Sequence, residues 1–157
     1  MKRRLWTAAA LGLATIGLAA CSEAPAPVEE GAPEAPDGIA VANGRLMLPA
    51  VAGNPAAVYF DVSNSGADNR MIRAASVAGA GRSMMHTTDA EAGMQETLQV
   101  MVPPGETVKF EPGGTHVMAM DLADTVTAGG EAEVTLTFVG GDKVSFPAAV
   151  RAAGDER

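Results

Sequence analysis

Short runs in which apolar and polar residues alternate are the main pattern of the chain after residue 38. Side chains of a strand alternate between its two faces, so such runs predict strands with one buried face. The first run, 56–62, places four apolar residues on one face: Ala56, Val58, Phe60 and Val62. The sequence Asn64-Ser65-Gly66 that follows is typical of a turn.

Further segments of the same kind follow, separated by turn-forming sequences such as Pro103-Pro104-Gly105 and Gly140-Gly141-Asp142. No segment after residue 20 has a sustained helical period. The chain is therefore predicted to be all-β, with a single domain over 39–150 built as an antiparallel β-sandwich or barrel. The further strands are expected at 71–77, 94–102, 107–111, 116–122, 134–139 and 144–150.

The first twenty residues have the features of an export signal. Three basic residues precede a stretch, 6–20, that contains no charge and is shorter than the roughly 20 residues of a membrane-spanning helix. Leu18-Ala19-Ala20 followed by Cys21 resembles a bacterial lipobox. We therefore predict a lipoprotein signal peptide over 1–20 and a lipid on Cys21, the only cysteine of the chain.

Residues 21–38 repeat Pro, Ala and Glu and contain almost no large apolar side chain. Such a composition cannot bury enough surface to fold, so this segment is predicted to be a disordered tether between the lipid and the domain. Residues 151–157 form a plain, charged C-terminal tail. The expected location is the periplasm, with the lipid holding the protein to a bacterial membrane.

The net charge limits the possible partners. The chain carries a formal charge of −8, and the predicted cleavage removes three basic residues and no acid, which leaves −11. A protein this acidic is not expected to bind nucleic acid or to hold anionic lipid with its own surface. Membrane attachment is therefore expected through the lipid alone.

Both histidines and six of the nine methionines lie between Met84 and Met120. On the predicted strand 116–122, His116 and Met118 point to the same face. His86 ends the run 82–86 before a polar loop, 87–93, and Met94 begins the next predicted strand. From His86 onward, seven, then twenty-one, then one residue separate successive members of a candidate ligand set: His86, Met94, His116 and Met118. The remaining alternatives for the second ligand are Met84 and Met101; Met47, Met71, Met85 and Met120 are expected to pack in the core.

The types of these side chains select the metal. Neutral imidazole and thioether are poor ligands for magnesium or calcium, and zinc prefers thiolate, imidazole and carboxylate. A set of His and Met favours Cu(I). A blue-copper site would need a cysteine thiolate, and the only cysteine is Cys21. A copper ion fully enclosed by protein ligands offers no open position to a substrate, so we expect binding and transfer and not an enzyme.

These residues resemble the PCu(A)C family of periplasmic copper chaperones. The resemblance rests on Met94, the sequence His116-Val117-Met118 twenty-one residues later, and the preceding Pro112-Gly113-Gly114. Further similar segments lie at 55–60, 63–66, 85–86, 102–105 and 135–138. The resemblance implies a cupredoxin-like Greek-key β-sandwich that binds Cu(I) through His86, Met94, His116 and Met118 and delivers copper to the CuA site of cytochrome c oxidase.

Two features depart from the family pattern. The loop 87–93 is shorter than usual in the family, and the His- and Met-rich tail of some relatives is absent. Three functions remain as alternatives: a chaperone that supplies an apo-oxidase CuA subunit or another periplasmic copper protein, a periplasmic copper-buffering or resistance lipoprotein, and a structural lipoprotein whose methionines only fill a core. The His and Met pattern favours the first two.

Overall fold

The computed structural model describes residues 35–155, so the predicted signal peptide, Cys21 and most of the predicted tether lie outside the described residues. Within this range the chain forms ten strands and no helix, and therefore no helix long and apolar enough to cross a membrane. The strands are β1 (Ile39–Met47), β2 (Ala56–Asn64), β3 (Arg70–Val77), β4 (Ala80–Asp89), β5 (Gly93–Glu96), β6 (Val100–Val102), β7 (Thr107–Phe110), β8 (His116–Leu122), β9 (Glu131–Phe138) and β10 (Lys143–Arg151).

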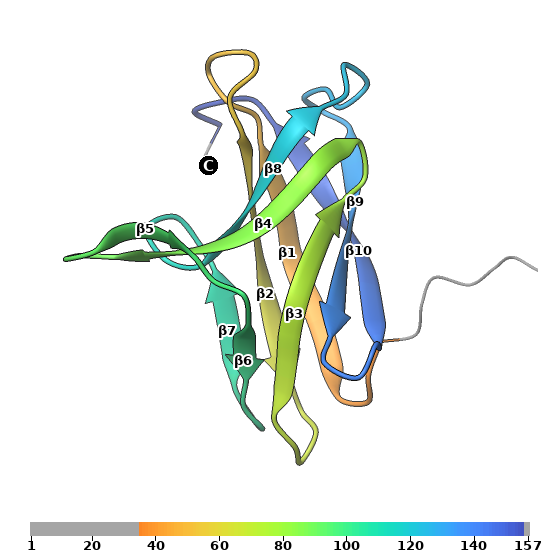
Figure 1. Ribbon diagram of the computed structural model, residues 1–157. Coiled ribbons are helices and arrows are strands. Elements are labelled where there is room, and N and C mark those ends of the chain that lie inside the picture. Colours follow the sequence, from red (N-terminus) through yellow and green to blue (C-terminus); the bar gives the residue numbers. More distant parts are fainter. Residues whose placement is uncertain (1–34, 156–157) are drawn as a thin grey trace, which may run out of the picture.

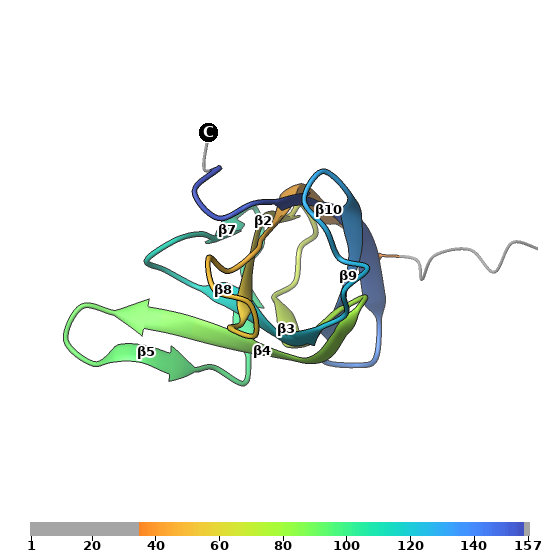
Figure 2. The same cartoon turned by 90° about the horizontal axis from the view of Figure 1, so that it is seen from above.

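All ten strands belong to one sheet, with the order β5-β4-β8-β2-β1-β10-β9-β3-β6, and β7 pairs with β2 beside this path. Every pairing is antiparallel except that of the first strand with the last, β1 with β10. The sheet curls so that, seen from above, its strands surround a central core (Figure 2). The β4–β5 hairpin extends outward beyond this ring (Figures 1 and 2). The all-β, single-sheet barrel confirms the predicted fold class.

The core is formed by the alternating apolar residues of the strands. The four apolar residues predicted to share a face of β2 are fully buried: Ala56, Val58, Phe60 and Val62. Phe60 stacks on Phe110 with ring centroids 4.2 Å apart and tilts against Phe146 at 5.0 Å. Burial of these side chains is the main force that stabilises the barrel.

The turn after β2 is held by a buried polar residue. Asn64 is 1% exposed, and its amide donates hydrogen bonds to the carbonyls of Asp68 (2.8 Å) and Val102 (2.9 Å). Its side-chain oxygen accepts the N–H of Gly66 at 3.0 Å. Because each of these groups is satisfied, Asn64 fixes this turn against β6.

The structure differs from two predicted segments and adds one strand. The single strand expected at 94–102 is two strands, β5 and β6, separated by 97–99. The loop expected at 87–93 is shorter, because β4 continues to Asp89 and pairs there with β5. Strand β1 was not predicted, since a bulge between Ala42 and Arg45, with Asn43 at φ 59°, interrupts its apolar alternation.

Candidate metal centre

The pairing of β4 with β8 brings both histidines together. In the antiparallel register His86 lies opposite His116, and Met84 lies opposite Met118. Residues directly opposite in such a pair share a face, so these four side chains form two adjacent rows on one face of the sheet. The other face of the same strands carries the buried Met85 and Val117. His116 and Met118 thus lie on one face, as predicted.

The two imidazoles are close and partly shielded from water. Their ring centroids are 6.0 Å apart with an interplanar angle of 31°. His116 is only 5% exposed, and the ring of Tyr59 on β2 lies beside it with ring centroids 6.3 Å apart. Tyr59 is covered in turn by the guanidinium of Arg45, 5.0 Å from its ring centroid. A metal held here would have the aromatic ring of Tyr59 nearby on the β2 side.

The turn before β8 orients the ring of His116. Its Nδ1–H donates a hydrogen bond of 3.0 Å to the carbonyl oxygen of Gly114. Because a carbonyl oxygen can only accept, Nδ1 carries the proton and the lone pair lies on Nε2. Metal-binding histidines are commonly held in this way by a hydrogen bond to their other nitrogen. The Pro112-Gly113-Gly114 turn reverses the chain with Gly113 at φ 78°, which glycine adopts without strain.

His86 presents an imidazole nitrogen with no partner. Its Nδ1 atom is shielded from solvent and accepts or donates no hydrogen bond among the described residues. A buried polar atom without a partner costs free energy, and a bound metal ion is one way to satisfy an imidazole nitrogen. His86 therefore fits the role of a metal ligand on an observation independent of the spacing pattern.

Met94 lies on the β4–β5 hairpin, at some distance from the paired rows. It is opposite Thr88, two residues beyond His86, and it is 56% exposed. The hairpin turn is closed by Asp89, whose Oδ1 accepts the N–H groups of Glu91 (2.8 Å) and Ala92 (3.0 Å). These two hydrogen bonds lower the pKa of the Asp89 carboxyl. The acidic residues near this turn, Asp89, Glu91 and Glu96, are exposed to solvent.

Four of the remaining methionines, Met47, Met71, Met85 and Met101, lie in the core or at the β3–β6 edge, and Met120 contacts Arg82. Met101 is in β6 opposite Met71 of β3, at the far edge of the sheet. Met47 and Met85 are buried in the core, as predicted, whereas Met71 is only half-buried. Met120 is also half-buried, and its sulfur lies 3.1 Å from a guanidinium nitrogen of Arg82.

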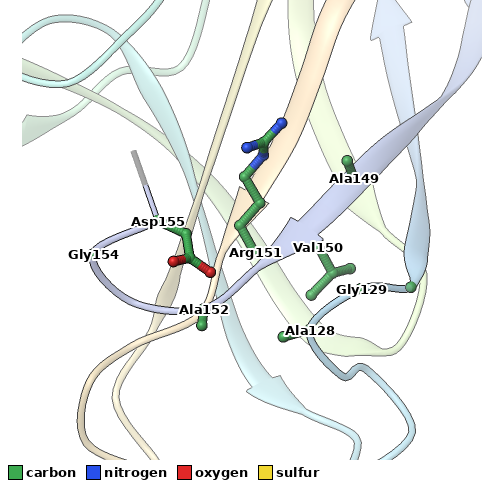
Figure 3. Close-up of a pocket in the computed structure, with 9 residues that line it drawn as sticks. Ala128, Gly129, Ala149, Val150, Arg151, Ala152, Gly154 and Asp155 are labelled. Atoms are coloured by element: carbon green, nitrogen blue, oxygen red, sulfur yellow. The ribbon is translucent and has the colours of Figure 1, made fainter. Parts of the chain in front are cut away.

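Oxygen and thiolate ligands do not gather at this site. Within residues 35–155, no three His, Cys, Asp or Glu side chains are arranged to hold a metal ion. Glu96 lies opposite His86 in the register but is exposed. A cavity of about 530 Å³ lies elsewhere, beside the C-terminal end of β10, and its lining includes Arg151 and Asp155 but no histidine or methionine (Figure 3). The two rows on β4 and β8 are thus the candidate metal centre.

Known proteins are similar to this chain in sequence. The family model described as "Putative lipoprotein LpqE-like" matches residues 39–150. "Putative lipoprotein Lxx21020" of Leifsonia xyli subsp. xyli (strain CTCB07) is 30% identical over 144 residues, which cover 88% of this chain and 84% of that protein.

Two solved PCuAC domains are similar in structure, with slightly lower sequence identity to this chain than the Leifsonia protein has. The copper-bound PCuAC domain from PmoF2 is 26% identical with a TM-score of 0.65, and the match covers 76% of this chain and 97% of that domain. The apo PCuAC domain from PmoF1 is 27% identical with a TM-score of 0.64, and the match covers 73% of this chain and 94% of that domain. The barrel described above is therefore the fold of PCuAC domains.

Proposed function

The chain belongs to the LpqE-like lipoprotein family, and from this membership and the geometry of β4 and β8 we propose that it is a lipid-anchored carrier of a single Cu(I) ion. Its ligands are His86, Met94, His116 and Met118. The protein binds and transfers copper, and it is not an enzyme.

The pairing of His86 with His116 carries this proposal. Two imidazoles with centroids 6.0 Å apart, one with an oriented ring and one with a buried nitrogen that lacks a partner, offer two lone pairs to one ion. Met118 lies beside them in the next row of the same face. The copper-bound PCuAC domain from PmoF2 has the same fold, which supports copper as the ion.

The chemistry of the ligands supports Cu(I) over divalent ions. Imidazole and thioether are neutral and polarisable, and such a set suits monovalent copper better than zinc, magnesium or calcium. No carboxylate or thiolate cluster in the described part of the chain competes for the ion. Because the proposed ligands are all neutral, the site with Cu(I) bound would carry the single positive charge of the ion.

Transfer to the CuA site of cytochrome c oxidase is the proposed outcome, with another periplasmic copper protein as the alternative recipient. The resemblance to the PCu(A)C family supports transfer of copper to the CuA site. A lipid on Cys21 and the segment 21–38 would keep the domain near membrane-bound recipients in the periplasm. A copper-buffering role would use the same site without a dedicated recipient.

Titration of the purified protein with Cu(I) in competition with a chromogenic Cu(I) chelator tests the proposal. We expect one tightly bound Cu(I) per chain and no displacement by an excess of Zn(II). The variants His86→Gln and Met118→Leu should lose tight binding, while Met101→Leu, at the far edge of the sheet, serves as the control. A stoichiometry of zero, or zinc that displaces copper, would refute the copper site. Transfer to a purified apo-CuA domain then distinguishes a chaperone from a buffer.

A further inference from the structure

Met84 lies closer to the paired ligands than Met94 does. It is directly opposite Met118 and two residues before His86 on β4, so it shares their face. Side chains directly opposite in an antiparallel pair have Cβ atoms about 5 Å apart. The four positions Met84, His86, His116 and Met118 therefore form a compact set from two neighbouring strands, and no part of the β4–β5 hairpin is needed to complete it.

Met94 is considerably further from Met118. It lies two strands away, on β5, and is opposite Thr88, four residues along β4 from Met84. With strands about 5 Å apart and a rise of about 3.4 Å per residue, the Cα atoms of Met94 and Met118 would be about 17 Å apart in a flat sheet. Two methionine side chains can share one ion over that distance only if the hairpin bends toward β8, whereas here the hairpin extends outward (Figure 2).

The next pair of residues along this face, Arg82 and Met120, is unsuited to binding a cation. Met120, the next residue of this face on β8, is opposite Arg82, whose guanidinium nitrogen lies 3.1 Å from the Met120 sulfur. The positive charge of Arg82 disfavours a second cation at that sulfur. The face therefore offers three thioethers to copper: Met84 and Met118 beside the histidines, and Met94 on the hairpin.

We propose that Met84 is a further ligand, which completes the resting site with His86, His116 and Met118, and that Met94 replaces Met84 on the copper, as the β4–β5 hairpin bends toward β8, when copper enters or leaves. This rests on the proposed function. Each exchange breaks one copper–sulfur bond as another forms, and the copper remains Cu(I). No electron or proton is required, because thioethers are neutral and do not titrate. Met94, 56% exposed on an outward hairpin, is accessible to a recipient, whereas Met84 is half-buried.

The test uses Met→Leu variants, which largely preserve volume, so that lost copper binding reports on ligation more than on folding. Cu(I) affinity is measured by chelator competition for Met84→Leu, Met94→Leu, the double variant and the control Met101→Leu. We expect Met84→Leu to weaken binding by at least about 100-fold, since a direct ligand contributes more than the residues that orient ligands, Met94→Leu to weaken it less, and the double variant to be weaker than either. Met94→Leu should instead slow the transfer of copper to the chelator. Met101→Leu should match the wild type.

Methionine-methyl NMR on the same protein gives a second readout. With Cu(I) added, the methyl signals of Met84 and Met118 should shift and that of Met101 should not. If Met118 shifts but Met84 does not, and Met84→Leu binds copper like the wild type, the inference is overturned while the copper site stands. If Met118→Leu and His86→Gln also bind like the wild type, the proposed function itself has failed.

Discussion

Replacement of His116 by glutamine separates the folding role of this residue from its proposed role as a ligand. The ring makes one hydrogen bond, to the carbonyl of Gly114, and the loss of such a bond costs about 1 kcal/mol. Lost ring contacts with Tyr59 and His86 add about 1 kcal/mol. A destabilisation of this size lowers the unfolding temperature of a domain of this length by about 10 °C and leaves it folded at room temperature. Copper affinity should fall by more than about 100-fold, since a direct ligand contributes more than the residues that orient it.

The assay combines two measurements on the purified mature protein. Thermal unfolding followed by circular dichroism reports stability. Copper binding is followed by the fluorescence of Tyr59, the only tyrosine; the one tryptophan, Trp6, lies in the predicted signal peptide. Copper held beside His116 is expected to quench Tyr59, because the two rings are 6.3 Å apart.

His86→Gln is the matched control for folding. The Nδ1 atom of His86 has no hydrogen-bond partner among the described residues, so this variant should lose copper with little loss of stability. A folded His116→Gln protein that binds Cu(I) like the wild type would refute the two-histidine site. An unfolding temperature unchanged by the substitution would refute the structural role given to the Gly114 hydrogen bond.

Three further predictions follow from other parts of the chain. Asn64→Ala should destabilise the domain by about 2–3 kcal/mol without changing copper affinity, because the buried carbonyl of Val102 loses its partner. Chemical denaturation measures the free energy of unfolding, and a loss below about 1 kcal/mol would contradict the prediction. The backbone hydrogen bonds from Glu91 and Ala92 lower the pKa of Asp89, so these contacts should be complete at neutral pH and be lost only as the pH falls below the ordinary pKa of 3.8. NMR titration of the Glu91 amide should give a midpoint below 3.8. A midpoint at or above 3.8 would show that the turn does not hold the carboxylate. Cys21→Ser should move the protein from the detergent-rich to the aqueous phase on phase partition, and a wild-type protein found in the aqueous phase would exclude the lipid.

The sequence predicts the class of fold and the face shared by His116 and Met118, because both depend on strand alternation, which is a local property. The segment 56–62 has apolar residues at every second position, and all four are fully buried. The spacing also predicts that the two histidines belong to one site. Their direct opposition depends on the register of β4 with β8, which the intervening loops set and alternation does not.

The methionine that accompanies His86 is harder to predict for the same reason. Spacing and resemblance favour Met94, while the register places Met84 beside Met118. A regular strand over 94–102 would put Met94 and Met101 in one element, yet the break at 97–99 sends Met101 to the opposite edge of the sheet, beside Met71. The break at 97–99 depends on where the chain crosses from β5 to β6 in the folded barrel, and the alternation of apolar and polar residues does not predict such a crossing. Strand β1 was not predicted because the bulge at Asn43 shifts the alternation of apolar and polar residues within the strand.

The parallel contact between the first and last strands has a consequence for how the domain folds. The β9–β10 hairpin lies between β1 and β3. Leu46 of β1 can therefore pair with Val150 of β10 only after almost the whole domain has been synthesised. Contacts this distant in the chain form slowly, typically in milliseconds to seconds. Until the hairpin inserts, β1 and β3 each present an unpaired edge that can join another chain. The strands that carry the proposed copper ligands precede that step, so a chain truncated before Glu131 should still pair β4 with β8 but should aggregate through its open edges.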